Sequence, residues 1–155
     1  MTLDKFDLEI LEVLQKNNLT PQRDIGDRIG LSAAAVQRRI KRMRETGVII
    51  ADVSVVDQSE LGHPLTIFVE VELKDEQLKL IDEAKQLFSS IPEVQQCYYV
   101  TGDVDFILVL VLPTMSDYEK LTRKLFFGNP NIKKFKTFVS MQSVKTTFEI
   151  PIIKK

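Results

Sequence analysis

The first fifty residues repeat their hydrophobic side chains at helical spacing in three separate segments. Apolar residues three to four positions apart predict an amphipathic helix in each segment. Asp4 or Thr2 is placed to cap the first helix. Thr20 with Pro21 is a typical start for the second, because a hydroxyl caps a helix and proline fits its first position. The positions expected to face the interior are Phe6, Ile10, Leu11, Leu14, Ile25, Ile29, Val36, Ile40 and Met43.

Only Gly30-Leu31-Ser32 separates the second predicted helix from the third. A short turn that contains glycine is typical of a helix-turn-helix, and Ser32 is a suitable cap for the helix that follows it. The β-branched residues in segments 48–50 and 53–56 predict a short hairpin, or wing. We therefore expect residues 1–50 to form a winged helix-turn-helix domain and residues 51–64 to form an extended connector.

Beyond the connector, the hydrophobic pattern changes repeatedly between that of a strand and that of a helix. Strands are expected over residues 65–73, 94–101, 105–112 and 135–141, and segment 105–112 is apolar throughout, which favours a central strand. Ser116 with Glu119 forms a capping box that predicts the start of the last helix. The order βαββαβ predicts a ferredoxin-like domain over residues 65–155, so the fold class of the chain is α+β.

The composition narrows the range of functions. The chain of 155 residues has one cysteine and one histidine, which excludes an internal disulfide and the common multi-histidine or multi-cysteine metal sites. No apolar run reaches the roughly 18 residues of a membrane-spanning helix, and the first residues are too charged for a signal peptide. We expect a cytoplasmic protein without a cofactor, in which Cys97 is a small apolar residue and His63 has no chemical role.

The net charge of −1 hides a basic segment in the third predicted helix. Five cationic side chains and one carboxylate, that of Glu45, give residues 32–46 a charge of +4. A solvated helical face is the ordinary explanation of such a run. The preceding turn and the single sign of the charge favour insertion into the major groove of DNA. We expect the front of the helix to meet base edges, through Ser32, Ala34, Gln37 and Arg38. The residues expected to meet phosphates are Thr20, Gln22, Arg23, Arg39, Lys41, Arg42 and Arg44.

One helix-turn-helix buries too little surface to bind DNA tightly and selectively. A two-fold dimer doubles the contacts and sets the half-site spacing near one helical turn, about 34 Å, or a multiple of it. A sheet with both helices on one face leaves the other face bare, so Phe68, Tyr98 and Phe138 are expected to join two copies. The alternative is that these residues pack against the helices of their own domain.

The order of these motifs resembles that of the Lrp/AsnC, or feast-famine, family of transcription regulators. This resemblance implies a DNA-binding regulator whose second domains pair into dimers and commonly assemble into octamers, in the cytoplasm of a prokaryote and associated with its nucleoid. It also implies small-molecule effectors, usually amino acids, bound at interfaces between the second domains. The resemblance covers the whole chain and rests on Leu3-Asp4, Asp7, Ile10-Leu11, residues 29–32, Val36, residues 38–43, residues 45–49, Leu61-Gly62, residues 99–106, Thr146-Thr147 and residues 150–152.

The family resemblance places the effector near the loop that contains Gly102. Backbone N–H groups at Gly102 suit the carboxylate of an amino acid, and Asp103 or Asp105 suits its ammonium group. Without the resemblance, a plain hairpin turn with solvated aspartates is the better explanation of this loop. The residues expected around the effector, across an interface, are Tyr99, Thr101, Gly102, Asp103, Asp105, Phe127, Ser140 and Gln142.

Two other functions compete with regulation. Ferredoxin-like domains include enzymes such as acylphosphatases, and fold alone does not decide function. We find no nucleophile–base pair, metal cluster or glycine-rich phosphate loop, so we expect no enzymatic activity. An architectural DNA-binding protein with little sequence preference is the third possibility, and it would bind all sequences with similar affinity.

Overall fold

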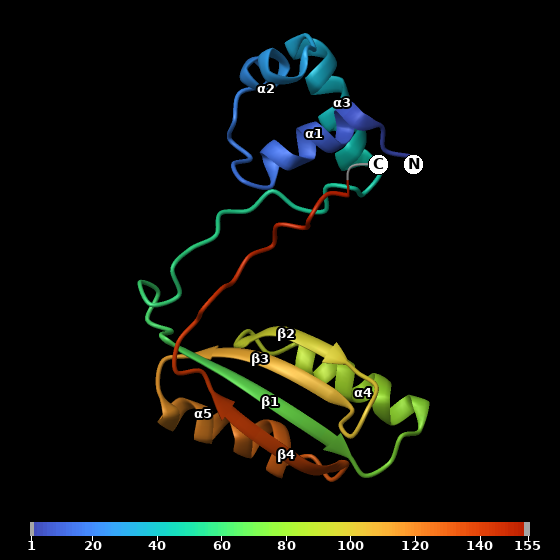
Figure 1. Ribbon diagram of the computed structural model, residues 1–155. Coiled ribbons are helices and arrows are strands. Elements are labelled where there is room, and N and C mark those ends of the chain that lie inside the picture. Colours follow the sequence, from blue (N-terminus) through green and yellow to red (C-terminus); the bar gives the residue numbers. More distant parts are fainter. Residues whose placement is uncertain (1, 154–155) are drawn as a thin grey trace. The chain divides into compact units, whose positions relative to one another are not determined.

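The computed structural model describes residues 2–153 (Figure 1). Met1, which begins the predicted domain 1–50, and Lys154 and Lys155, which end the predicted domain 65–155, lie outside the described residues. The chain divides into two compact units. The first contains the residues up to Ser54 and those from Lys145 onward, and the second runs from Val55 to Val144. The elements are, in order, α1 (Lys5–Leu14), α2 (Gln22–Ile29), α3 (Ala33–Glu45), β1 (Leu65–Leu73), α4 (Leu78–Ser89), β2 (Val94–Tyr99), β3 (Phe106–Leu112), α5 (Met115–Thr122), the π-helical turn η1 (Arg123–Phe127) and β4 (Ile132–Val139).

The three helices of the first unit pack around a small core, as the helical spacing predicts. The residues that form its buried centre are Ile10, Ile25, Val36, Ile40 and Met43. Asp4 caps α1 and forms a capping box with Asp7, while Ser32 caps α3 by accepting a hydrogen bond from the backbone N–H of Ala35. Gly30 ends α2 with φ at 77°, a left-handed conformation that favours glycine.

The predicted cap of α2 is wrong. The hydroxyl of Thr20 donates a hydrogen bond to the carbonyl of Asn17, and the N-cap position belongs to Pro21, which has no side-chain hydrogen bond to offer. Because the Thr20 hydroxyl is bonded to Asn17, it does not cap α2. The φ angle that the ring of Pro21 fixes is what prepares the backbone for the first turn of α2.

The predicted wing does not form. Residues 48–57 contain no strand, and Ile50, Val53 and Val55 are all largely exposed. β-branched residues favour a strand only where a neighbouring strand pairs with the backbone and a surface covers the side chains. Within the described chain, no strand pairs with this segment, and only Val48 and Ile49 pack against the helical core.

The second unit is a four-stranded antiparallel sheet in the order β2-β3-β1-β4. Helices α4 and α5 lie on the same face of the sheet, as Figure 1 shows. Alternate residues of β1 and β3 point toward these helices, and Ile67, Val69, Leu108 and Leu110 are completely buried there. This arrangement confirms the predicted ferredoxin-like α+β fold, with β3 as an internal strand.

The start of α5 differs from the predicted capping box. Thr114 is the N-cap, and its hydroxyl accepts a hydrogen bond from the backbone N–H of Asp117. The helix therefore begins before Ser116, because threonine and aspartate three residues apart satisfy the first turn equally well. Past Thr122 the helix widens into the π-helical turn η1.

The other face of the sheet has no helix of residues 2–153 on it, and it exposes aromatic side chains beside the charged pair Glu70 and Lys136. Phe68 of β1 lies directly opposite Phe138 of β4, and their side chains are 40% and 47% exposed. Tyr98 of β2 is 54% exposed. These side chains do not pack against the helices of their own unit, so that alternative is wrong.

The described end of the chain returns to the helical unit. The segment from Lys145 onward groups with α1–α3, whereas the sequence pattern assigns residues 65–155 to one domain. In the structure, the compact unit that contains the sheet ends at Val144. The tail contacts the helical unit through hydrogen bonds between the Gln15 side chain and the Ile150 backbone. A hydrophobic pattern in the sequence does not reveal polar contacts of this kind.

Candidate functional site

A close approach between α2 and the following turn fixes where α3 begins. A Cβ on Gly26 would lie 2.3 Å from the carbonyl oxygen of Leu31, far inside van der Waals contact. The carbonyl oxygen of Gly26 in turn accepts hydrogen bonds from the backbone N–H groups of Gly30 and Leu31. Only glycine permits this packing, so the turn has a single geometry and α3 has a defined direction relative to α2.

The outer face of α3 carries side chains that suit recognition of a polar surface. Val36, Ile40 and Met43 turn inward, which leaves Gln37, Arg38 and Lys41 exposed. Arg38 forms no ion pair with any carboxylate in residues 2–153. Lys41 approaches Glu45 one turn away at 3.8 Å, and both are well exposed, so solvent screens this pair.

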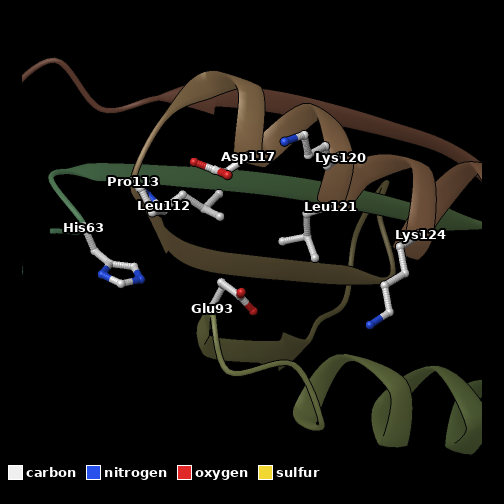
Figure 2. A pocket seen from close by; sticks show the side chains of 8 residues that line it. All are labelled: His63, Glu93, Leu112, Pro113, Asp117, Lys120, Leu121 and Lys124. Carbon is white, nitrogen blue, oxygen red and sulfur yellow. The ribbon is translucent and has the colours of Figure 1, made fainter. Parts of the chain in front are cut away.

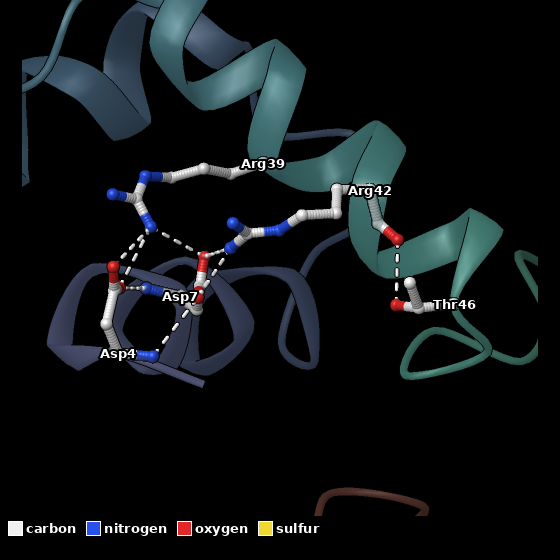
Figure 3. Close-up of polar contacts among 5 residues, drawn as sticks. All are labelled: Asp4, Asp7, Arg39, Arg42 and Thr46. Carbon is white, nitrogen blue, oxygen red and sulfur yellow. Dashed lines mark hydrogen bonds and ion pairs between the residues drawn. The ribbon is translucent and has the colours of Figure 1, made fainter. Parts of the chain in front are cut away.

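Two other arginines of α3 turn toward α1 and hold a buried carboxylate (Figure 3). The Asp7 side chain is 1% exposed, and Arg39 Nη1 lies 2.8 Å from its Oδ1. Arg42 Nη2 donates to both oxygens of Asp7, at 2.8 and 2.7 Å. Arg39 Nη1 also reaches Asp4, at 2.7 Å. Charge-assisted hydrogen bonds of this kind join α1 to α3.

These contacts reduce the cationic charge that α3 presents. Arg44 is also paired, by two hydrogen bonds at 2.8 and 3.2 Å from its guanidinium to the carboxylate of Asp52. The Asp7 backbone N–H and the Arg39 guanidinium hold the pKa of Asp4 below its usual range, so it carries its negative charge at neutral pH. Arg38 and Lys41 are therefore the cations of α3 that are freest to meet an external anion.

The sequence pattern did not indicate the acidic pair on α1. The sequence explains Asp4 as a helix cap and gives Asp7 only as part of the family resemblance, and neither explanation indicates an ion pair. The available signal was the excess of arginine on α3 and the acidic side chains at the start of α1.

A hollow of about 230 Å³ lies on α3 and suits a small anion such as a phosphate group. Its lining residues are Ala35, Arg38, Arg39 and Arg42.

The remaining predicted contacts of this unit lie at the start of α2 and α3. Arg23 and Ala34 are exposed, and Gln22 is half-buried. The hydroxyls of Thr20 and Ser32 already have local partners, Asn17 and Ala35. The Ser32 oxygen accepts its hydrogen bond, so its own proton remains available for a further acceptor.

In the second unit, the Gly102 loop is held in place by Asp105. The Asp105 carboxylate accepts a hydrogen bond of 2.7 Å from the backbone N–H of Leu73, and its own backbone N–H donates to the carbonyl of Val71. Asp105 is buried, and one oxygen of its carboxylate is engaged by this hydrogen bond. Asp103 is exposed, and Gly102 has φ at 114°, outside the range of other residues.

Tyr99, Thr101 and Phe127 lie at the same end of the sheet as this loop. The Tyr99 ring packs on Phe106 at 5.3 Å, and the exposed Phe127 ring meets Phe135 edge-on at 5.4 Å. Phe106 and Phe135 are both paired with the same residue of β1, Val71. These residues share one end of the sheet, but Tyr99 lies on the edge strand β2 and Phe127 packs beside the opposite edge strand β4.

Ser140 and Gln142 lie at the opposite end of the sheet. The backbone N–H of Ser140 donates to the carbonyl of Thr66, five residues along β1 from Val71. At about 3.4 Å per residue, roughly 17 Å separate the two positions. One copy of the chain therefore does not bring Ser140 and Gln142 to the Gly102 loop, and they can meet it only from another copy.

The second unit has a pocket that the sequence did not predict (Figure 2). It has a volume of about 290 Å³ and lies where β3 ends and α5 begins, with the apolar side chains of Leu112 and Leu121 between charged groups. His63 lines it, with its Nδ1 2.9 Å from the carbonyl of Leu61. The remaining lining residues are Glu93, Pro113, Asp117, Lys120 and Lys124.

Elsewhere, no helix within residues 2–153 has both the length and the apolar character needed to cross a membrane. Within the same residues, no group of three or more histidine, cysteine, aspartate or glutamate side chains is arranged to hold a metal ion.

Two family models match the chain, one for each unit. The model described as a winged helix-turn-helix DNA-binding domain matches residues 3–50, and the one described as the Lrp/AsnC ligand binding domain matches residues 66–150. The HTH-type transcriptional regulator y4tD of Sinorhizobium fredii is 45% identical over 98% of this chain and 90% of that protein. The leucine-responsive regulatory protein of Haemophilus influenzae is 30% identical over 94% of this chain and 87% of its own length.

Solved structures agree with these matches. The crystal structure of an AsnC family transcriptional regulator from Agrobacterium tumefaciens superposes with a TM-score of 0.90 at 28% sequence identity. The superposition covers 96% of this chain and 97% of that one, so both units are shared.

Proposed function

Because this chain belongs to the Lrp/AsnC family of transcriptional regulators, we propose that it binds an operator sequence through α3 and that an amino acid controls this binding. The family consists of regulators rather than enzymes. The observation that carries the proposal is the outward face of α3, which offers Gln37, Arg38 and Lys41 from the second helix of a helix-turn-helix. Such a protein would act in the cytoplasm, where it meets the DNA.

The proposed DNA contacts divide into two groups. Gln37 suits an adenine edge, where its amide donates one hydrogen bond and accepts another, and Arg38 suits a guanine edge, to which its guanidinium donates two. Ser32 and Ala34 lie nearby at the front of the helix. Lys41 suits a phosphate. At the start of α2, Thr20, Gln22 and Arg23 are placed to meet the backbone of the DNA. Arg39, Arg42 and Arg44 contribute to the positive field around α3, while their internal carboxylates fix their positions.

We propose that the bare face of the sheet joins two copies. Phe68, Tyr98 and Phe138 form an exposed apolar surface, which a second copy of the same sheet would bury. A pair of α3 helices would then face two half-sites, and further assembly of dimers, up to an octamer, would follow the pattern of the family.

The proposed effector site lies between copies and is built around the Gly102 loop. Gly102 offers backbone N–H groups to a carboxylate, and the exposed Asp103 replaces Asp105 as the partner of an ammonium group. Tyr99, Thr101 and Phe127 adjoin the loop, and Ser140 with Gln142 would come from a neighbouring copy. The name of the leucine-responsive relative supports an amino acid as the ligand class.

Selection of bound duplexes from a random DNA pool tests both parts of this proposal. The selection is run with and without a mixture of the twenty common amino acids, on the wild type and on Gly102→Glu. We expect the wild type to enrich one family of sequences, and we expect the bound fraction to change severalfold when the amino acids are present. Gly102→Glu should enrich the same sequences without responding to amino acids, because its added carboxylate repels that of the effector.

Gly102→Ala is the control, because it introduces the same backbone strain without the charge. Failure of the wild type to enrich any sequence would contradict DNA recognition. An equal response to amino acids in the wild type and Gly102→Glu would contradict the assignment of the effector site to this loop.

A further inference from the structure

The side chain of Gln15, just past the end of α1, binds the backbone of a residue 135 positions away. Gln15 Nε2 donates to the carbonyl oxygen of Ile150 at 3.0 Å, and the backbone N–H of Ile150 donates to Gln15 Oε1 at 2.6 Å. The amide of Gln15 thus pairs with both polar groups of one peptide residue, as a neighbouring strand would. Next to it, Lys16 faces Glu149 at 3.9 Å.

This recognition depends on the backbone of residue 150 and not on its side chain. The Ile150 side chain is 70% exposed, so it contributes little apolar burial. The Lys16–Glu149 pair is also largely exposed and adds little. Gln15 therefore holds this part of the tail, which we define as residues 145–150, through the backbone of Ile150.

Because the tail belongs to the helical unit, the chain passes between the two units twice. It leaves the first unit after Ser54 and returns to it after Val144. A single extended connector would let the helical unit rotate freely about its axis. A second connection, anchored at Gln15, restricts that rotation.

We propose that Gln15 is a positioning residue for operator recognition: by anchoring the tail, it limits the orientations of each helix-turn-helix and so sets the half-site spacing that a pair of them accepts. This inference rests on the proposed function. A pair of freely rotating heads would bind operators of several spacings with similar affinity, whereas a pair held by two connections would prefer one spacing.

The first test measures the docking itself, without DNA. Hydrogen exchange of the Ile150 amide is compared in the wild type, Gln15→Ala and the control Ile150→Ala, which keeps the backbone and removes only an exposed side chain. We expect Gln15→Ala to exchange about fivefold faster or more at residue 150, and Ile150→Ala to match the wild type after correction for intrinsic rates. Equal exchange in the wild type and Gln15→Ala would overturn the proposal.

The second test measures spacing preference. Duplexes carrying the sequence that the wild type selects from a random pool are prepared with the half-sites moved apart or together by one or two base pairs. We expect the loss of affinity on changing the spacing to be at least threefold smaller for Gln15→Ala than for the wild type. The helical circular dichroism of both proteins should agree, which shows that the variant is folded.

The outcomes separate this proposal from the one on which it rests. Faster exchange in Gln15→Ala with an unchanged spacing preference would overturn the role of Gln15 in positioning and leave operator recognition intact. A wild type that selects no DNA would contradict the proposed function and with it the role in spacing, while the exchange rates would still decide whether the tail is docked through Gln15.

Discussion

At the scale of single residues, the cations of α3 differ in what they can do. The sequence places Arg38, Arg39 and Arg42 in one basic run and assigns all three to DNA, Arg38 to base edges and the other two to phosphates. In the folded chain, Arg39 and Arg42 hold the buried Asp7, and Arg38 has no ion pair with a described carboxylate. Periodicity predicts which face of a helix is buried, but it does not predict which long side chains turn back toward a neighbouring helix. That difference is the reason for proposing that Arg38, rather than Arg39 or Arg42, contacts base edges.

We therefore expect Arg38→Ala to weaken binding to the selected operator at least tenfold, in line with the roughly 1–3 kcal/mol of a good base contact. The free energy of unfolding should change by less than about 0.5 kcal/mol, since the residue is exposed. Fluorescence anisotropy with labelled duplex and urea unfolding measure the two effects. Arg123→Ala is the control, with the same charge change on η1. Equal affinities of the two variants would contradict a direct role for Arg38.

At the scale of elements, the hydrophobic pattern predicted every helix and strand that is described, with small shifts at their ends. It failed where the structure depends on a partner rather than on the segment itself. The β-branched residues after α3 have no strand to pair with, so the wing is absent. Thr20 and Ser116 do not cap the helices they were expected to begin, because Thr20 bonds to Asn17 and Thr114 takes the N-cap position of α5. The contact between α1 and α3 through Asp7 is of the same kind, because it depends on two segments at once.

Asp7→Asn tests how strongly this contact joins α1 to α3. The carboxamide removes the carboxylate that pairs with Arg42 and leaves Arg39 with Asp4 alone. Breaking a buried ion pair costs about 3–5 kcal/mol when both groups are fully buried. Because Arg42 is 47% exposed, we expect a smaller loss in the free energy of unfolding, about 2–3 kcal/mol. Urea unfolding followed by circular dichroism at 222 nm provides the measurement. The matched control is the exposed Asp27→Asn, and the same midpoint for both variants would show that the contact is unimportant.

At the scale of the whole molecule, the sequence predicted two functional parts and the face by which copies would join. Alternation along β1 placed Phe68 on the face away from the helices, and the structure leaves it exposed opposite Phe138. The return of the tail to the helical unit could not be predicted, because Gln15 recognises a backbone and any residue except proline would offer the same groups. The pattern of side chains also could not show that Ser140 and Gln142 lie far from Gly102 in one copy, because that distance depends on the register between strands.

The central claim is that the sheet units pair and so present two α3 helices to DNA together. Analytical ultracentrifugation of the protein, alone and with the selected duplex at low ionic strength, tests it most directly. We expect the free protein to have at least twice the 17.8 kDa mass of one chain, and to bind the duplex with an affinity that falls steeply as salt is added. A species of 17.8 kDa that does not sediment with the duplex would contradict the account.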